Sequence, residues 1–303
     1  MSVINRSFTT RRAMLGAIAT SPLWMQSAWA QASKDAMPDM ARIISGFPAG
    51  GTADALARRV GDRMRGHYAA SLVVDNKPGA GGQIGILNLR DSPADGTSLL
   101  ITPSSMLSIY PYTYPKLRYT LDDVAPVSLG AMFDHGLAVG PGVPDSVRTL
   151  ADLLDWMRAN PGSANYGSPG AGSMPHMVGV LLGQFSKIDM RHIAYRGTVP
   201  GMQDLLGGQI PAFWGPIGDY LQHGKGGKLR VLAIAGSKRS PFLPQVPTLT
   251  ELGYPLKVSE WYGFFLPGKA TAEVRRRAAA YLKPALGSQD VIDSLAQVGM
   301  EVR

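Results

Sequence analysis

The chain has 303 residues, enough for one large or two modest domains, and 45% of them are hydrophobic. This composition predicts a globular protein with a sizeable core and argues against disorder. There is no cysteine, so disulfide bonds, thiolate zinc sites, thiol nucleophiles and a lipid anchor on cysteine are not expected. The formal net charge is +8, without a long basic run. Such an excess favours small anionic ligands and is weak support for nucleic-acid binding.

Residues 1–30 are typical of an export signal. The pair Arg11 and Arg12 precedes a stretch of apolar and small residues over 13–25, and residues 28–30 read Ala-Trp-Ala. A basic start, an apolar middle and a small-x-small end define a secretory signal peptide. We therefore expect cleavage near Ala30 and a periplasmic mature protein. The arginine pair favours the twin-arginine route, and the Sec route remains the alternative.

Strand and helix patterns alternate along the rest of the chain. The first part predicts strands at 41–44, 72–74 and 98–101, with helices over 53–68 and from Gln83 onward. This order indicates a largely parallel sheet covered by helices. The pattern then restarts, with strands at 137–139, 164–166, 192–195, 210–213 and 231–234, and helices over 150–160, 174–187, 199–206, 270–286 and 289–298. Two lobes that share one continuous chain path fit this order.

Two glycine-rich loops stand where a strand passes into a helix. They cover residues 47–54 (FPAGGTAD) and 166–176 (YGSPGAGSMPH). Such a loop directs unpaired backbone N–H groups and the positive end of a helix dipole at one point, which attracts a carboxylate or a phosphate. Because one loop falls in each expected lobe, a dicarboxylate, or a carboxylate with a second polar end, would find two facing anchors.

Enzyme and cofactor motifs fail on spacing. The glycines of residues 79–85 miss the dinucleotide pattern by one position, and the phosphate-loop, metalloprotease and nucleophile-elbow motifs are absent. The five histidines show no metal spacing, so neither a cofactor nor a metal is expected. One catalytic alternative remains, an exported serine hydrolase or transferase that uses Ser168 or Ser173 with His176. The missing nucleophile elbow weighs against it, and we expect a protein that is not an enzyme.

The order of the loops resembles the extracytoplasmic solute receptors of the tripartite tricarboxylate transporter type, also called the Bug family. The resemblance covers nearly all of the chain after the signal. Its markers are the segments FPAGG at 47–51, DNKPGAGG at 75–82, PADGT at 93–97, APVSL at 125–129, YGS at 166–168, YRG at 195–197, DLLGGQ at 204–209, KRSP at 238–241 and VPT at 246–248.

The resemblance implies an α/β, two-lobed periplasmic-binding-protein (Venus-flytrap) fold with crossover strands, and it implies no catalysis. Lobe 1 is expected over 33–130 and 262–303, and lobe 2 over 131–261. The implied protein is a monomer that binds a small carboxylate for membrane transporter subunits. The implied ligand-binding residues lie in the loops of both lobes: Phe47, Ala49, Thr52, Ala53, Asp54, Ser104, Ser168, Ala171, Ser173 and His176, with Tyr195 and Gly197 as wall residues.

Trp214 marks a departure from the family pattern. Members of the family often have an acid or a small polar residue at this position, after the phenylalanine that is here Phe213. A tryptophan in the cleft wall would favour an aromatic or extended aliphatic carboxylate over a compact hydroxylated one such as citrate. The alternative is that Trp214 packs inside its lobe, where it would not contact the ligand.

We predict that the mature protein begins at or near Gln31. N-terminal sequencing of periplasmic material tests this, and mature protein that retains residues 1–30 would contradict it. If export uses the twin-arginine route, replacing Arg11 and Arg12 by lysine should block it. Unchanged export of that variant would indicate the Sec route.

Overall fold

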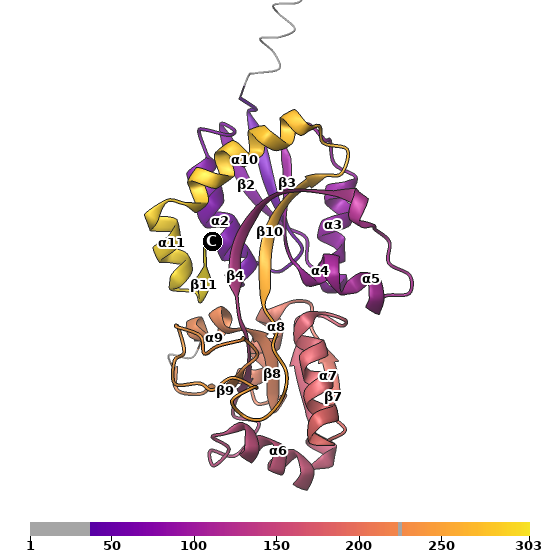
Figure 1. Ribbon diagram of the computed structural model, residues 1–303, viewed down its shortest axis with the longest axis vertical. Coiled ribbons are helices and arrows are strands. Elements are labelled where there is room, and N and C mark those ends of the chain that lie inside the picture. Colours follow the sequence, from indigo (N-terminus) through magenta and orange to yellow (C-terminus); the bar gives the residue numbers. More distant parts are fainter. Residues whose placement is uncertain (1–36, 224–225) are drawn as a thin grey trace, which may run out of the picture. The chain divides into compact units, whose positions relative to one another are not determined.

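The computed structural model describes residues 37–223 and 226–303, and the expected signal peptide lies outside these residues. Residues Pro38–Arg303 form one compact unit. It contains two mixed α/β sheets, each with its own helices, which form two lobes (Figure 1).

The sheet of lobe 1 has six strands: β1 (Met40–Ser45), β2 (Ser71–Asn76), β3 (Ser98–Pro103), β4 (Val124–Phe133), β10 (Glu260–Pro267) and β11 (Met300–Glu301). Their order across the sheet is β11-β4-β10-β3-β1-β2. Strand β1 pairs in parallel with β2 and β3, whereas β10 is antiparallel to β3 and β4. The sheet is therefore parallel at one side and antiparallel at the other.

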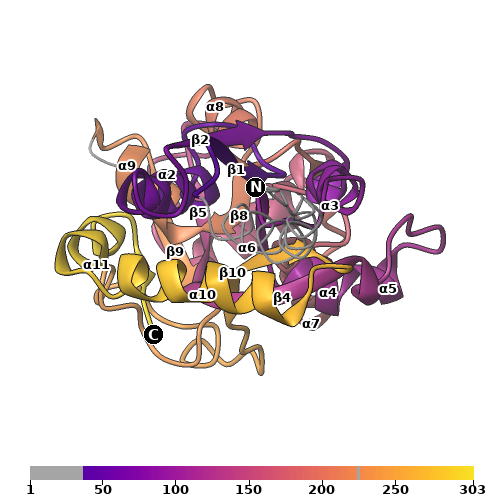
Figure 2. The same cartoon turned by 90° about the horizontal axis from the view of Figure 1, so that it is seen from above.

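Helices cover both faces of this sheet (Figure 2). Successive strand residues point to opposite faces, so Ile43 and Ile44 of β1 enter different cores. Ile43 packs with α2 (Thr52–Met64), α10 (Ala272–Leu286) and α11 (Gln289–Ala296). The core around Ile44 is formed with helices α3, α4 and α5, which span Gln83–Arg90, Ser105–Ser108 and Tyr110–Thr113.

The sheet of lobe 2 has five strands: β5 (His135–Val139), β6 (Asn165–Ser168), β7 (Arg191–Ala194), β8 (Ala212–Pro216) and β9 (Arg230–Ile234). Their order is β7-β6-β8-β5-β9. Its helices are α6 (Leu150–Ala159), α7 (Met174–Ser186), α8 (Thr198–Leu206) and α9 (Ile217–His223). Three short 3₁₀ helices, η1 (Ala80–Gly82), η2 (Leu121–Asp123) and η3 (Pro161–Ser163), complete the described elements of the two lobes.

Trp214 lies inside lobe 2. It belongs to β8 and is 1% exposed, in the core that β5 and β8 form with α6 and α7. Its neighbour Phe213 points to the opposite face, into the core with α8 and α9. Of the two alternatives for Trp214, the structure therefore has the packed one. The expectation that Trp214 forms an aromatic wall of the cleft is therefore wrong.

Two strands carry the chain between the lobes. Only Asp134 separates β4 of one sheet from β5 of the other, and the chain returns through β10. At the crossing Glu260 pairs with Phe133, and the Ala235 amide donates to the His135 carbonyl at 2.9 Å. The crossover strands implied by the resemblance are confirmed. The first three expected strands do pair in parallel, but the whole sheet is mixed, because both crossover strands enter antiparallel to their neighbours.

Most elements expected from the sequence are present within a few residues. The helix at 150–160 begins as predicted, because the Thr149 hydroxyl accepts from the Asp152 amide and the Asp152 carboxylate accepts from the Thr149 amide. The strand expected at 210–213 begins two residues later, at Ala212. The described residues include no helix that is both long and apolar enough to cross a membrane.

Replacing Trp214 with alanine should lower the free energy of unfolding by about 3–5 kcal/mol, because the side chain leaves a cavity in the core of lobe 2. Urea unfolding measures this loss. Trp156→Ala is the control, since Trp156 is only partly buried against the same core and should cost less. Near-normal stability of Trp214→Ala would contradict the packing described above.

Candidate functional site

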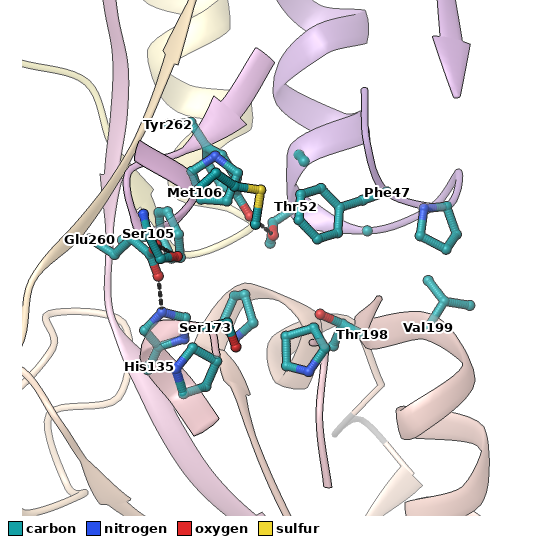
Figure 3. A pocket seen from close by; sticks show the side chains of 18 of the residues that line it. Phe47, Thr52, Ser105, Met106, His135, Ser173, Thr198, Val199, Glu260 and Tyr262 are labelled. Carbon is teal, nitrogen blue, oxygen red and sulfur yellow. Dashed lines mark hydrogen bonds and ion pairs between the residues drawn. The ribbon is translucent and has the colours of Figure 1, made fainter. Parts of the chain in front are cut away.

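A pocket lies between the two lobes, and residues of both lobes line it (Figure 3). The space that its atoms leave unfilled is about 500 Å³, including the part of the mouth that is open to solvent. Lobe 1 and the crossover strands supply Phe47, Pro48, Gly51, Thr52, Ala53, Pro103, Ser105, Met106, Tyr110, Phe133, Glu260 and Tyr262. Lobe 2 supplies His135, Pro169, Ser173, Pro175, Thr198, Val199 and Pro216.

The amino termini of three helices meet at this pocket. Thr52 and Ala53 begin α2, Ser173 is the N-cap of α7, and Thr198 begins α8. The first amides of a helix have no partner inside it, and the helix dipole places about half a positive charge there. Among the described residues that line the pocket there is no Lys or Arg. Any attraction for an anion at the pocket wall therefore comes mainly from backbone dipoles.

Asp54 holds the first glycine-rich loop, residues 47–54, in place through hydrogen bonds. Its carboxylate accepts from the Gly50 amide at 3.0 Å, from Arg58 Nε at 2.9 Å and from Asn76 Nδ2 at 3.0 Å. Burial acts to raise the pKa of Asp54, but these hydrogen bonds outweigh it and hold the pKa below its usual value. Asn76 also donates to the Phe47 carbonyl at 3.1 Å. Asp54 is thus a buried support of the loop and does not line the pocket.

The second loop is held by its own polar side chains. The Ser173 hydroxyl donates to the Gly170 carbonyl at 2.6 Å, and the Gly172 amide donates to His176 Nδ1 at 2.8 Å. Ser168 is fully buried and lies 2.7 Å from His192 Nε2, whose ring stacks on His176. Burial, with His176 adding to it, lowers the pKa of His192 to about 4. Within the described residues no hydrogen bond joins His176 to Ser168 or Ser173.

Apolar side chains form much of the wall. The rings of Phe133 and Tyr262 stack with centroids 4.3 Å apart and an interplanar angle of 16°. In Figure 3, Phe47 and Met106 lie on the lobe 1 side and Val199 faces them from lobe 2. A ligand with a ring or an aliphatic chain could bury that part here, at about 25 cal/mol for each Å² of apolar surface.

A buried acid lies at the crossover end of the pocket. Glu260 is 1% exposed and is held from both lobes. One carboxylate oxygen accepts from the Ser105 amide at 2.9 Å and from the Ser105 hydroxyl, and the other pairs with His135 Nε2. A buried carboxylate requires such partners, since removing an ion from water is otherwise very unfavourable. These contacts join β10 to the start of α4 and to β5.

A second buried acid, Asp219, connects the lobes directly. It lies in the first turn of α9 and is 3% exposed. Its Oδ1 accepts from the Thr52 amide of α2 at 3.1 Å, while the Thr52 hydroxyl lies 2.9 Å from the Tyr262 hydroxyl. Burial raises the pKa of Asp219 to about 7, and the Thr198 hydroxyl, the Thr52 amide and His135 oppose the rise.

Four of the residues expected from the sequence line the pocket, namely Phe47, Thr52, Ala53 and Ser173. The others lie around it. Ala49 is exposed. Ser104 is buried beside the crossover, and its amide donates to the Trp261 carbonyl. The Tyr195 hydroxyl donates to Asp204 at 2.8 Å. Ala171 and Gly197 form contacts between the lobes. Asp54, Ser168, His176 and Trp214 are the supporting or packed residues described above.

The lobes touch through backbone at several points. The Tyr114 hydroxyl donates to the Ala171 carbonyl at 2.8 Å, across the lobes. A Cβ on Gly197 would lie 2.5 Å from Pro48 Cδ, and Gly197 has φ +104, so only glycine fits there. A Cβ on Gly170 would lie 3.1 Å from the Gly81 Cα. The lobes are therefore in close contact around the pocket.

The pocket also contains residues that sequence reasoning did not select. His135, Ser105, Thr198 and Val199 line it, and Asp219 lies behind Thr52. Glu260 and Tyr262 line the pocket as well. For the start of α8, the sequence offers one local sign, Gly197, which stands between a strand and a helix. His135 and Asp219 are separated from Thr52 by more than 80 residues, and no local pattern marks them.

This fold, with a pocket enclosed between two lobes, defines a periplasmic solute-binding protein. The profile of the tripartite tricarboxylate transporter family receptor matches residues 56–303, and the chain belongs to this family. It is 33% identical over 258 residues to the UPF0065 protein of the tcbD–tcbE intergenic region of Pseudomonas sp. strain P51, covering 84% of this chain and 76% of that one. To Protein BugT of Bordetella pertussis it is 32% identical over 261 residues, covering 85% and 79%.

Solved structures agree with the family. A periplasmic transporter superimposes with a TM-score of 0.81 at 31% identity, covering 87% of this chain and 88% of that one. MatC of Rhodopseudomonas palustris with bound malate gives a TM-score of 0.80 at 26% sequence identity, covering 87% of this chain and 90% of that one. An adipate-bound protein of the same organism gives 0.81 at 27%, covering 87% and 88%. The two-lobed fold is confirmed. Because the family consists of non-enzymatic receptors, the hydrolase alternative is wrong.

The buried Asp219 makes stability depend on pH. Its pKa of about 7 in the folded protein exceeds the ordinary value of 3.8, so the folded state holds an extra proton between these values. The unfolding free energy of the wild type should therefore fall, relative to Asp219→Asn, as pH rises from about 4 to about 7. Urea unfolding of both proteins across this range measures the difference, in which other groups cancel. A constant difference would contradict the raised pKa.

Proposed function

We propose that this protein is exported, captures a small carboxylate between its two lobes in the periplasm, and delivers it to a tripartite tricarboxylate-type transporter. The observation that carries the proposal is the meeting of the amino termini of α2, α7 and α8 at one pocket. Backbone amides at helix ends bind carboxylates through charge-assisted hydrogen bonds. Family membership supports the transporter as the destination, and a role in sensing is the alternative.

The two ends of the site would hold different parts of the ligand. Thr52 and Ala53 would present their amides to a carboxylate from lobe 1, and Ser173, Thr198 and Val199 would close over it from lobe 2. Two facing anchors suit a dicarboxylate, and two relatives of known structure carry malate and adipate. The Phe133 and Tyr262 stack and the proline-rich wall favour a ligand with an apolar body, aromatic or extended aliphatic, over citrate.

We predict that calorimetry and thermal shift will detect binding of at least one carboxylate from a panel of malate, adipate, benzoate, terephthalate and citrate. A ligand at about 100 times its dissociation constant should raise the unfolding free energy by about 2.7 kcal/mol. Adipate or an aromatic acid should bind more tightly than citrate. Equal affinity for citrate and the aromatic acids would contradict the role of the apolar wall, and no binding by any of them would contradict the proposal.

A bulky residue at position 51 should abolish this binding. Gly51 lines the pocket, and a Cβ there would lie 3.9 Å from Asp219 Oδ1 and 4.0 Å from a Val199 methyl, so the first atom fits. The longer side chain of Gly51→Leu would fill the space between the lobes and prevent the ligand from reaching the backbone. Gly162→Leu is the matched control, because a Cβ at Gly162 meets no atom within 4 Å. Unchanged affinity in Gly51→Leu would place the ligand elsewhere.

A further inference from the structure

The amide at the start of α2 already has a carboxylate bound to it. Thr52 N has no partner inside the helix, and the proposed function assigns it to a solute carboxylate. In this structure it donates to Asp219 Oδ1 at 3.1 Å. Asp219 belongs to lobe 2, whereas α2 belongs to lobe 1. The hydrogen bond therefore does two things at once, because it satisfies a helix-end donor and connects the two lobes.

The surroundings of Asp219 show that this carboxylate is incompletely satisfied. It is 3% exposed, and its second oxygen, Oδ2, has no hydrogen-bond partner within residues 37–223 and 226–303. Most buried polar atoms do have a partner, so a carboxylate with one oxygen left without a hydrogen bond is held less firmly than a fully bonded one. Thr198, which lines the pocket, lies beside it.

The ionisable groups around Asp219 come from β5, β10, α9 and α2. His135 of β5 acts to lower the pKa of Asp219, and its Nε2 is paired with Glu260 of β10. Tyr262 of β10 binds the Thr52 hydroxyl, and Tyr220, on the same helix as Asp219, donates to the Gly136 and Phe213 carbonyls. On α2, the nearby acid Asp54 is paired with Arg58. A second negative charge at the α2 end would therefore be opposed by Asp219.

We propose that Asp219 is an internal stand-in for the solute carboxylate: it occupies the α2 amide and bridges the lobes when no solute is bound, and a solute anion binds only when Asp219 moves away or takes up a proton. The second half of this statement rests on the proposed function, and the first half does not. The raised pKa of Asp219 agrees with proton uptake near neutral pH. Asp219 thus becomes a specificity residue that lowers affinity for anions when it is ionised.

The bridge can be tested without any solute. The mature protein would be unfolded in urea, dialysed and refolded to remove bound carboxylates, and then measured by small-angle scattering and by hydrogen exchange of the Thr52 amide. Asp219→Ala should give a larger radius of gyration and faster exchange at Thr52 than the wild type. Asp204→Ala is the control, because Asp204 accepts from Tyr195 within lobe 2 and should change neither. Identical values in wild type and Asp219→Ala would overturn the bridge.

If Asp219→Ala does not fold, Asp219→Leu decides the same question. Leucine has a similar volume and cannot accept from the Thr52 amide, and apolar replacements of buried charges often leave a protein folded. The expected result is again a larger radius of gyration and faster exchange at Thr52. A compact Asp219→Leu protein with a protected Thr52 amide would overturn the bridge.

The competition with solute is tested by calorimetry with adipate. In the wild type, affinity should fall several-fold, and by at most tenfold per pH unit, between pH 6 and pH 8, because the ionised Asp219 opposes the solute. Asp219→Asn keeps the acceptor oxygen without the charge, so its affinity should change little over the same range. The same pH dependence in both proteins would overturn the competition. Failure of adipate to bind either protein would count against the proposed function, and the solute-free measurements would still decide the bridge.

Discussion

The hydrogen-bonded Glu260 carboxylate is the interaction on which the arrangement of this site depends. Glu260 lies where the chain returns from lobe 2 to lobe 1, and its oxygens bind Ser105 on one side and His135 on the other. A carboxyl group that is 1% exposed needs such partners, because burial without hydrogen bonds is strongly unfavourable. The two crossover strands, the start of α4 and the first residue of β5 are therefore held together at one point, directly beside the pocket.

The positions of Tyr262, Thr52 and Asp219 depend in turn on this crossing of the chain. The fixed crossover places β10 beside β4, so Tyr262 stacks on Phe133 and reaches the hydroxyl of Thr52. Thr52 begins α2, and its amide meets Asp219 from the other lobe. The pocket is thus bounded by backbone amides, aromatic rings and one buried acid, Glu260, and no described Lys or Arg lines it. Recognition of an anion by such a wall depends on geometry more than on net charge.

Features that depend on local sequence were predictable. Thr149 and Asp152 fix the start of α6, and the two glycine-rich loops were placed correctly before α2 and α7. Strands β4 and β10 were not predicted as elements from their hydrophobic pattern; only the resemblance implied crossover strands there. Strand β4 contains Pro126 and Gly130, and both residue types are uncommon inside strands. The alternation of helices and strands in the sequence gives no sign that these two strands pair antiparallel to their neighbours.

The residues that form the site were harder to predict from the sequence than the loops that carry some of them. A strand side chain changes face with each step, so Phe213 and Trp214 could not be assigned to core or cleft without the register of β8. His135, Asp219 and Glu260 meet through the crossing of two strands that are distant in sequence. The family resemblance implied Asp54 as a ligand residue, but its three hydrogen bonds make it a support of the loop.

The contacts between the lobes have an evolutionary consequence. Where the lobes meet around the pocket, Gly170 approaches Gly81, Gly197 approaches Pro48, and Tyr114 binds the carbonyl of Ala171. At each of these places a glycine or a main-chain carbonyl of lobe 2 meets lobe 1, so close approach here depends on a few small residues and one tyrosine. The pocket wall, in contrast, consists largely of side chains such as Met106 and Val199. Descendants of such a protein could acquire new nutrients by exchanging a few wall residues, while the surfaces that bring the lobes together stay unchanged.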